Sequence, residues 1–204
     1  MPVNWFDPTG YMIGDVAVFM GGRSKSKVFQ FAYVAIKFFQ RVLRRVPKGR
    51  DAVHVMLRVE PAKMPSAWQS TEWPRTIRRE LRIPWGERVA FLRYKRREEI
   101  TPAGWGALYD ISLALNGQPY DPVDLLNFVG AFFRLGKLKD LGDDKLVCST
   151  AVARIWEGVA KASSLPPIFP GGWESVTPAD WYNCPAFEVL EVIEGRVGLK
   201  KKPK

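Results

Sequence analysis

The sequence has few of the residues that build metal sites and disulfide scaffolds. Its 204 residues include two cysteines, Cys148 and Cys184, and one histidine, His54. Zinc sites use a full set of cysteine and histidine ligands, and disulfide scaffolds need more cysteines than this. We therefore expect no metal and no cofactor. A single disulfide between Cys148 and Cys184 stays open as a minor alternative to two reduced thiols.

The sequence also lacks any long hydrophobic run. No stretch reaches the roughly 18 apolar residues that a membrane-spanning helix needs. Residues 1–7 have neither the basic nor the apolar part of a secretion signal. These absences predict a cytoplasmic or peripheral membrane protein. We expect one domain over residues 1–199, followed by a basic disordered tail over residues 200–204.

Acidic residues are outnumbered. The chain has 21 Asp and Glu against 31 Lys and Arg, which gives a formal net charge of +10. Such an excess favours an anionic partner such as nucleic acid, an anionic membrane surface or an acidic polymer. The simpler interpretation of each basic run is a solvated surface. No known nucleic-acid motif accompanies the charge, which by itself is a weak indicator.

Hydrophobic periodicity and turn residues predict an α+β fold, with strands separated by helices. A helix over residues 101–116 begins at Thr101-Pro102, an N-cap hydroxyl followed by proline at the first helical position. The strongest helix pattern covers residues 27–46, with Lys37 and Arg41 on a polar face and Gln40 flanking it. The other expected helices are 121–133, 148–162 and a short turn at 177–180, and the expected strands are 14–20, 52–60, 67–70, 87–95 and 186–193.

Cys148 is the first candidate for chemistry, because the periodic pattern places it at the start of a helix. The positive end of the helix dipole and the free N–H groups of the first turn stabilise a thiolate there. A thiolate with a base in reach is an activated nucleophile. His54 is the one histidine that could serve as that base, although a lone histidine in an apolar strand is more often a core residue. Cys184, which precedes a proline, is expected to be a buried structural thiol.

The order of these parts is informative. A Gly14-Asp15 turn enters a strand, His54 lies in the next strand, and a polar segment, Trp68-Gln69-Ser70-Thr71, lies in a third. Cys148-Ser149 at a helix start and Thr177-Pro178 before the last strand follow later in the chain. This order resembles the circularly permuted branch of the NlpC-type papain-like cysteine hydrolases, the YiiX-like group. Lecithin:retinol acyltransferase-like proteins are more distantly similar.

The resemblance implies a papain-like, permuted NlpC-type fold, with a small antiparallel sheet and the nucleophile helix packed against it. It implies Cys148 as nucleophile, His54 as general base and Gln69 as the residue that orients the imidazole. The family often has a carboxylate at the third position, so Glu72 or Glu60 is an alternative or supplementary partner. Tyr120 matches a tyrosine that the family places beside the cysteine, where its phenol could donate to an oxyanion. The alternative is that Tyr120 packs its ring in a turn.

Three functions follow as expectations. The first is a cysteine hydrolase that cleaves an amide or ester through an acyl-enzyme, with peptidoglycan peptides among its substrates. The second is a lipid-directed thiol acyltransferase or esterase at an anionic membrane surface. The Phe-rich segments 27–46 and 127–134 support it, although both also fit a protein core. The third is a non-catalytic structural or nucleic-acid-binding protein on the same fold. The sequence leaves the oligomeric state open.

Overall fold

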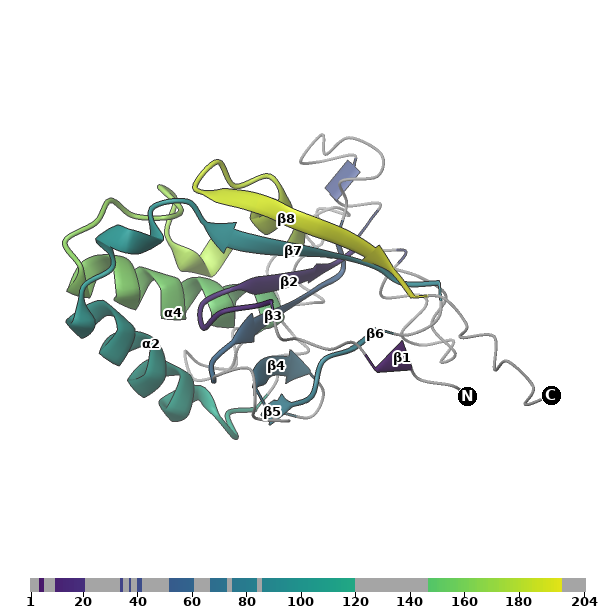
Figure 1. Ribbon diagram of the computed structural model, residues 1–204, viewed down its shortest axis with the longest axis horizontal. Coiled ribbons are helices and arrows are strands. Elements are labelled where there is room, and N and C mark those ends of the chain that lie inside the picture. The colour runs from purple at the N-terminus through teal and green to yellow at the C-terminus, as the bar shows by residue number, and fades with distance from the viewer. Residues whose placement is uncertain are drawn as a thin grey trace, which may run out of the picture.

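The fold combines an antiparallel sheet with helices on one side of it (Figure 1). This computed structural model describes residues 4–5, 10–20, 34, 37, 40–41, 52–60, 67–72, 75–83, 86–119 and 147–195. The strands are β1 (Asn4–Trp5), β2 (Val16–Phe19), β3 (His54–Arg58), β4 (Trp68–Glu72), β5 (Arg75–Arg79), β6 (Arg82–Ile83), β7 (Arg88–Tyr94) and β8 (Phe187–Glu194). The helices are α2 (Pro102–Leu115), α4 (Cys148–Ala162) and α5 (Pro178–Tyr182), with 3-10 turns η1 (Arg97–Glu99) and η2 (Trp173–Ser175).

The described strands form a six-stranded sheet in the order β5-β4-β3-β2-β7-β8, and β1 pairs separately with β6. All these pairings are antiparallel. In the centre Val18 lies opposite Val55 on β3 and opposite Ala90 on β7. This arrangement confirms the expected α+β class with a small antiparallel sheet.

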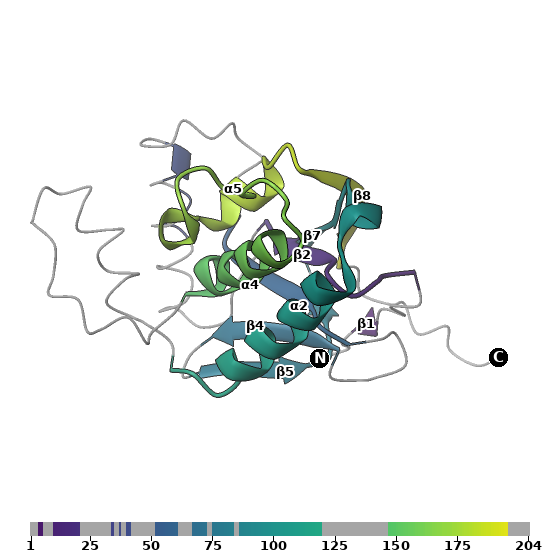
Figure 2. The same ribbon diagram turned by 90° about the vertical axis from the view of Figure 1, so that its left-hand side faces the viewer.

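The sheet has two buried faces, because side chains alternate along each strand. The helix-covered face carries Val16, Val18, Val55, Leu57, Ala90 and Leu92, which pack with residues of α2 and α4. The far face carries Ala17, Phe19, Met56, Trp68, Val89 and Phe91, which pack with Tyr11, Leu81 and Ile83. Figure 2 shows α2 and α4 running beside each other over the sheet.

Helices α2 and α4 begin where the sequence predicts. The Thr101 side chain accepts a hydrogen bond from the Gly104 N–H at 3.1 Å, and Pro102 follows at the first helical position. Gly117 has φ +88° just beyond α2, the left-handed conformation that glycine adopts without strain. The two helices pack closely at Gly104, where an added Cβ would lie 2.0 Å from Ser163 Oγ and 3.3 Å from the Val159 carbonyl oxygen.

The Gly14-Asp15 turn connects several elements of the fold through hydrogen bonds and close packing. Asp15 is fully buried, and its carboxylate accepts the Met12 N–H at 2.7 Å and two hydrogen bonds from Arg93 at 2.9 and 2.6 Å. Gly14 has φ +87°, and an added Cβ would lie 3.3 Å from the Trp156 ring. The turn thus binds the start of β2 to β7 and to α4, which accounts for both residues without a role in chemistry.

Two parts of the pattern differ from expectation. Residues 75–79, which the sequence presents as a basic run, form strand β5, with Thr76 buried and Arg78 paired to Glu60 at 2.8 Å. Of the helix expected at residues 27–46, the four described residues are helical, but Val34 is 62% exposed and Gln40 is fully buried. The Gln40 amide donates to the Ala52 carbonyl and accepts its N–H, so a polar residue here faces inward.

Two expected segments lie outside the described residues. They are the helix at 121–133, which includes most of the Phe-rich segment 127–134, and the tail at 200–204. Within the described parts of the chain, no helix is long and apolar enough to cross a membrane.

Candidate functional site

Cys148 is the first residue of α4, as predicted. Val147 at the N-cap position has no polar side chain, so the first-turn N–H groups are not capped from that position. By helical spacing Cys148 lies on the same side of α4 as Val152, Ile155 and Val159, which belong to the core between the helices and the sheet. Its side chain is 7% exposed. The thiol therefore belongs to the side of α4 that faces the sheet, at the positive end of the helix dipole.

The direction of α4 places its beginning near the end of the sheet where β3 starts. Trp156, eight residues after Cys148, contacts Tyr94 and Phe187. Tyr94 and Phe187 pair at one end of the sheet, whereas Phe19 and His54 pair toward the other. A helix rises about 1.5 Å per residue, so Cys148 lies about 12 Å along the axis from Trp156. Helix α4 packs on β3, and Trp156 in its second half lies at the Tyr94–Phe187 end of the sheet. The N-terminus of α4 therefore points toward the other end, which holds His54 (Figure 1).

His54 is the first residue of β3, and its ring is held on the far face. Its Nε2 lies 2.8 Å from Ser70 Oγ, and the ring packs beside Phe19 at a centroid distance of 5.5 Å. Burial, with a smaller contribution from the Arg79 charge, lowers the pKa of His54 from 6.5 to about 3. The imidazole is therefore neutral at neutral pH, and its low pKa makes it a weak base in this environment.

Gln69 does not orient His54, contrary to expectation. It lies opposite Leu57 on the helix-covered face, and its Nε2 donates to the Ser112 carbonyl of α2 at 3.0 Å. Ser70, the next residue, lies opposite Met56 on the far face and contacts His54 instead. The difference has a simple cause: a shift of one residue along a strand moves a side chain to the other face. The alternation of side chains along β4 is the signal that could have identified Ser70. Trp68 and Ser70 share one face, and Gln69 lies on the other, so Gln69 and Ser70 cannot both face His54.

The other candidates are distributed as follows. Glu60 accepts a hydrogen bond from Arg78 at 2.8 Å, which engages it in an ion pair between strands. Glu72 ends β4, where the structure describes its backbone alone. Tyr120 lies outside the described residues. Of the predicted triad, the structure places Cys148 at the helix start and His54 in β3, but His54 hydrogen-bonds Ser70 and not Cys148.

The two faces also separate Cys148 from His54. Cys148 follows, by helical spacing, the side of α4 whose Val152 and Ile155 pack in the core on the helix-covered face, whereas His54 pairs with Phe19 on the far face. A contact between the thiol and the imidazole therefore has to form around the start of β3, where buried Val53 continues the chain and donates its N–H to the Phe19 carbonyl at 2.8 Å. His54 is the first residue of the strand.

The two cysteines of the chain are both buried, and they do not form a disulfide with each other. Cys184 follows α5, and its Sγ lies 4.0 Å from the Ile168 carbonyl oxygen. Burial raises the pKa of the Cys184 thiol, so the protein environment keeps it protonated. Cys184 thus behaves as the structural thiol that the sequence predicts.

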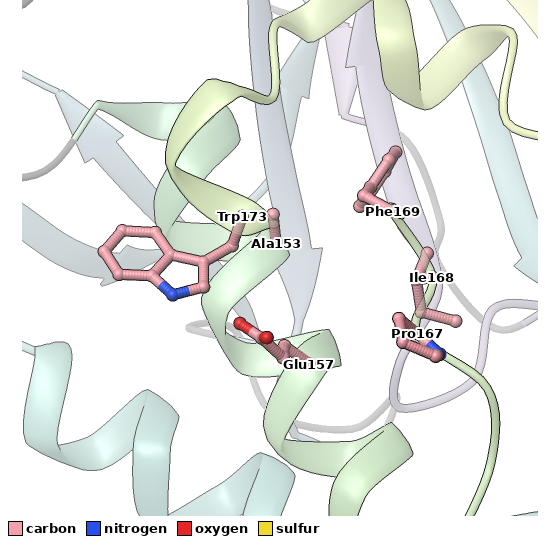
Figure 3. Close-up of a pocket in the computed structure, with 6 residues that line it drawn as sticks. All are labelled: Ala153, Glu157, Pro167, Ile168, Phe169 and Trp173. Carbon is pink, nitrogen blue, oxygen red and sulfur yellow. The ribbon is translucent and has the colours of Figure 1, made fainter. Parts of the chain in front are cut away.

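A small hollow opens on the other side of α4 (Figure 3). Its empty space, which includes a part open to solvent, is about 200 Å³ and lies between α4 and the segment that follows it. It is lined by Ala153, Glu157, Pro167, Ile168, Phe169 and Trp173. Ala153 and Glu157 are turned about 140° and 180° around the helix from Cys148, so this hollow does not adjoin the thiol.

Among the described residues, no group of histidine, cysteine, aspartate and glutamate side chains is arranged to hold a metal ion. The fold and site define an α+β protein with a six-stranded antiparallel sheet and a cysteine at the start of a helix packed on that sheet. No protein-family model matches the chain, and neither a curated protein nor a solved structure matches it.

Proposed function

We propose that this chain is a cysteine hydrolase of the permuted papain-like, NlpC type. The observation that carries the proposal is the position of Cys148, which opens a 15-residue helix packed on β3, the strand that starts with His54. A helix N-terminus favours the thiolate. Burial disfavours the protonated form of His54, so proton transfer requires the imidazole to meet the thiol, whose thiolate charge then stabilises the imidazolium. The order of the Gly-Asp turn, histidine strand, cysteine helix and final strand β8 supports the same class.

The reaction follows from these two groups. His54 takes the proton of the Cys148 thiol, and the sulfur attacks the carbonyl carbon of an amide or ester. The amine or alcohol leaves with the proton from His54, and water then hydrolyses the thioester to regenerate the thiol. Ser70, which contacts His54 at 2.8 Å, takes the orienting position that the sequence suggests for Gln69. The reaction requires the imidazole and the thiol to meet past the start of β3.

Two substrate classes fit the proposal. A peptidoglycan peptide is the amide substrate that the resemblance suggests. A lipid ester or amide at an anionic membrane surface is the other, and the net charge of +10 favours it. In that case the protein acts as a peripheral acyltransferase or esterase, and flotation with anionic liposomes distinguishes it from a cytoplasmic amidase.

The test is the pH dependence of Cys148 alkylation by iodoacetamide, measured in a Cys184→Ser background. We expect a thiolate that titrates below about pH 7.5, and we expect His54→Ala to shift this titration toward that of an ordinary thiol, near 8.5. Cys148→Ser is the control for labelling at any other position. An ordinary titration in both the parent and His54→Ala would overturn the proposal.

A second candidate is a non-catalytic structural or nucleic-acid-binding protein on this fold. The observation that favours it is the hydrogen bond from His54 to Ser70 on the face away from α4. A histidine held in this way is a core residue, and Cys148 is then a small buried side chain. Binding to duplex DNA or RNA that weakens steeply with salt, combined with an ordinary Cys148 titration, would support this candidate.

A further inference from the structure

Strand β8 is an outer strand whose free edge is long. It is the last strand in the order of the six-stranded sheet and pairs along its length with β7 (Figure 1). Among the described residues, no strand pairs with its other edge. An eight-residue edge of this kind presents a row of backbone N–H and C=O groups to solvent.

The side chains of this edge are unusually apolar for solvent-exposed positions. Val189 is 46% exposed, Leu190 36% and Val192 41%. Val189 lies opposite Leu92 and Val192 opposite Ala90, so both valines are on the helix-covered face, beyond the area that the helices bury. Leu190 is the extra residue of an irregularity in the pairing between Phe91 and Leu92. Natural edge strands are more often protected by lysine, proline or a short length.

The far face of the same edge is acidic. Glu191 lies opposite Phe91 and accepts a hydrogen bond from Tyr11, and Glu188 lies opposite Arg93. Glu194, which ends the strand, lies opposite Arg88 on the helix-covered face. Three glutamates in eight residues contrast with a chain whose net charge is +10. The far face of β8 thus carries two exposed carboxylates, Glu188 and Glu191, with Arg93 of β7 opposite Glu188.

We infer that the free edge of β8 binds an extended peptide segment in which apolar and basic residues alternate, and that this segment adds a strand to the sheet. The backbone groups of the segment pair with those of β8. Because successive side chains of a strand alternate between faces, its apolar residues lie beside Val189 and Val192, while its basic residues lie beside Glu188 and Glu191. This surface is separate from the Cys148 site and does not depend on the proposed hydrolase activity.

Charge argues against a second copy of this chain as the occupant. Antiparallel pairing of β8 with its own copy brings glutamates of the two strands near one another, and like charges across strands are destabilising. Two chains of net charge +10 also repel at long range. The same positive charge opposes unspecific attraction of a basic peptide, so binding of such a peptide requires the carboxylates of Glu188 and Glu191.

The test uses the full chain and a fluorescent peptide, Lys-Val-Lys-Val-Lys-Val-Lys, followed by anisotropy. We expect saturable binding, and we expect Glu188→Lys with Glu191→Lys to weaken it about tenfold. The matched control is Asp110→Lys with Glu157→Lys, which makes the same change of charge at exposed positions on α2 and α4 and should leave affinity unchanged. The native chain with a fully N-methylated peptide, which cannot donate backbone hydrogen bonds, should show no binding, and this arm does not depend on the folding of any variant.

Three results would overturn the inference. One is equal binding of the peptide and its Glu-Val counterpart, and another is equal loss in the β8 and control variants. The third is a dimer in light scattering that Val192→Lys dissociates while the peptide does not compete with it, because the occupant is then a second copy of the chain.

Discussion

The two faces of the sheet hold different kinds of chemistry. The helix-covered face holds Val152 and Ile155 from α4, whose side of the helix Cys148 shares by spacing, together with Gln69, whose amide donates to the Ser112 carbonyl of α2. The far face holds His54 with Ser70 and an aromatic cluster of Tyr11, Trp68 and Phe91. The two residues expected to react are thus on different sides of β3. The position of a polar residue along its strand sets the face on which its side chain lies. The face in turn limits which partners the residue can reach, whatever its chemical type.

The largest expected effect tests whether both faces are true cores. Trp156 on the helix-covered side and Phe91 on the far face are both fully buried. Trp156→Ala and Phe91→Ala should each lower the free energy of unfolding by about 3–5 kcal/mol, because each leaves a cavity. Urea titration measures this loss in the free energy of unfolding, and the dependence of that free energy on urea concentration should stay unchanged. A cost near zero for Phe91→Ala alone would show that the far face contributes no core.

A smaller effect is expected where α2 meets α4 above the sheet. Gly104→Ala should cost about 1–3 kcal/mol, because the new methyl group would lie against Ser163 and the backbone of α4. Gly106, in the same helix, has open space around a new Cβ. Gly106→Ala should therefore stabilise the protein by about 0.5–1 kcal/mol, since alanine favours helix. Thermal unfolding of the two variants side by side measures the contrast, and equal shifts would contradict the close approach of the two helices.

The far face should make stability depend on pH through His54. The unfolded chain protonates His54 below about pH 6.5, whereas burial in the folded protein delays protonation to about pH 3. The unfolded state therefore binds more protons between these values, and stability falls as pH falls. From pH 7 to pH 5 this group should cost about 2 kcal/mol. His54→Gln should lack this contribution, and an identical loss in the parent and the variant, measured by urea titration at both pH values, would exclude a buried neutral imidazole.

The smallest effect distinguishes the two neighbours on β4. Ser70→Ala should cost about 1 kcal/mol by removing the hydrogen bond to His54. It should also change the imidazole ¹⁵N chemical shifts, because the Nε2 partner is lost. Gln69→Leu breaks its bond to Ser112 on the other face and should leave those shifts unchanged. Perturbation of His54 by Gln69→Leu and not by Ser70→Ala would reverse the assignment of the two faces.

Much of the secondary structure is predictable because its signals are local. Thr101-Pro102 fixes the start of α2, and Thr177 with Asp180 caps α5 through bonds of 2.7 Å from both the backbone N–H and the hydroxyl of Thr177. The apolar spacing after Cys148 fixes α4 to within a residue. Strand β5 is not predictable in the same way, because three of its five residues are arginines and no apolar alternation is visible. Its burial depends on pairing with β4, which is a tertiary contact. The helical pattern places Gln40 beside the polar face, although the residue is buried. The pattern cannot reveal its partner, the backbone of Ala52, which lies twelve residues further along the chain.

The sequence by itself determined that Cys148 opens a helix, that His54 lies in a strand and that the chain carries a large positive charge. Each of these depends on neighbouring residues or on composition alone. The tertiary structure decided that Ser70 rather than Gln69 meets His54, that Asp15 is buried against Arg93, and that β8 has a free edge. Those outcomes depend on strand order and register, which arise from pairing between segments far apart in the chain, and a one-residue change in register exchanges the two faces.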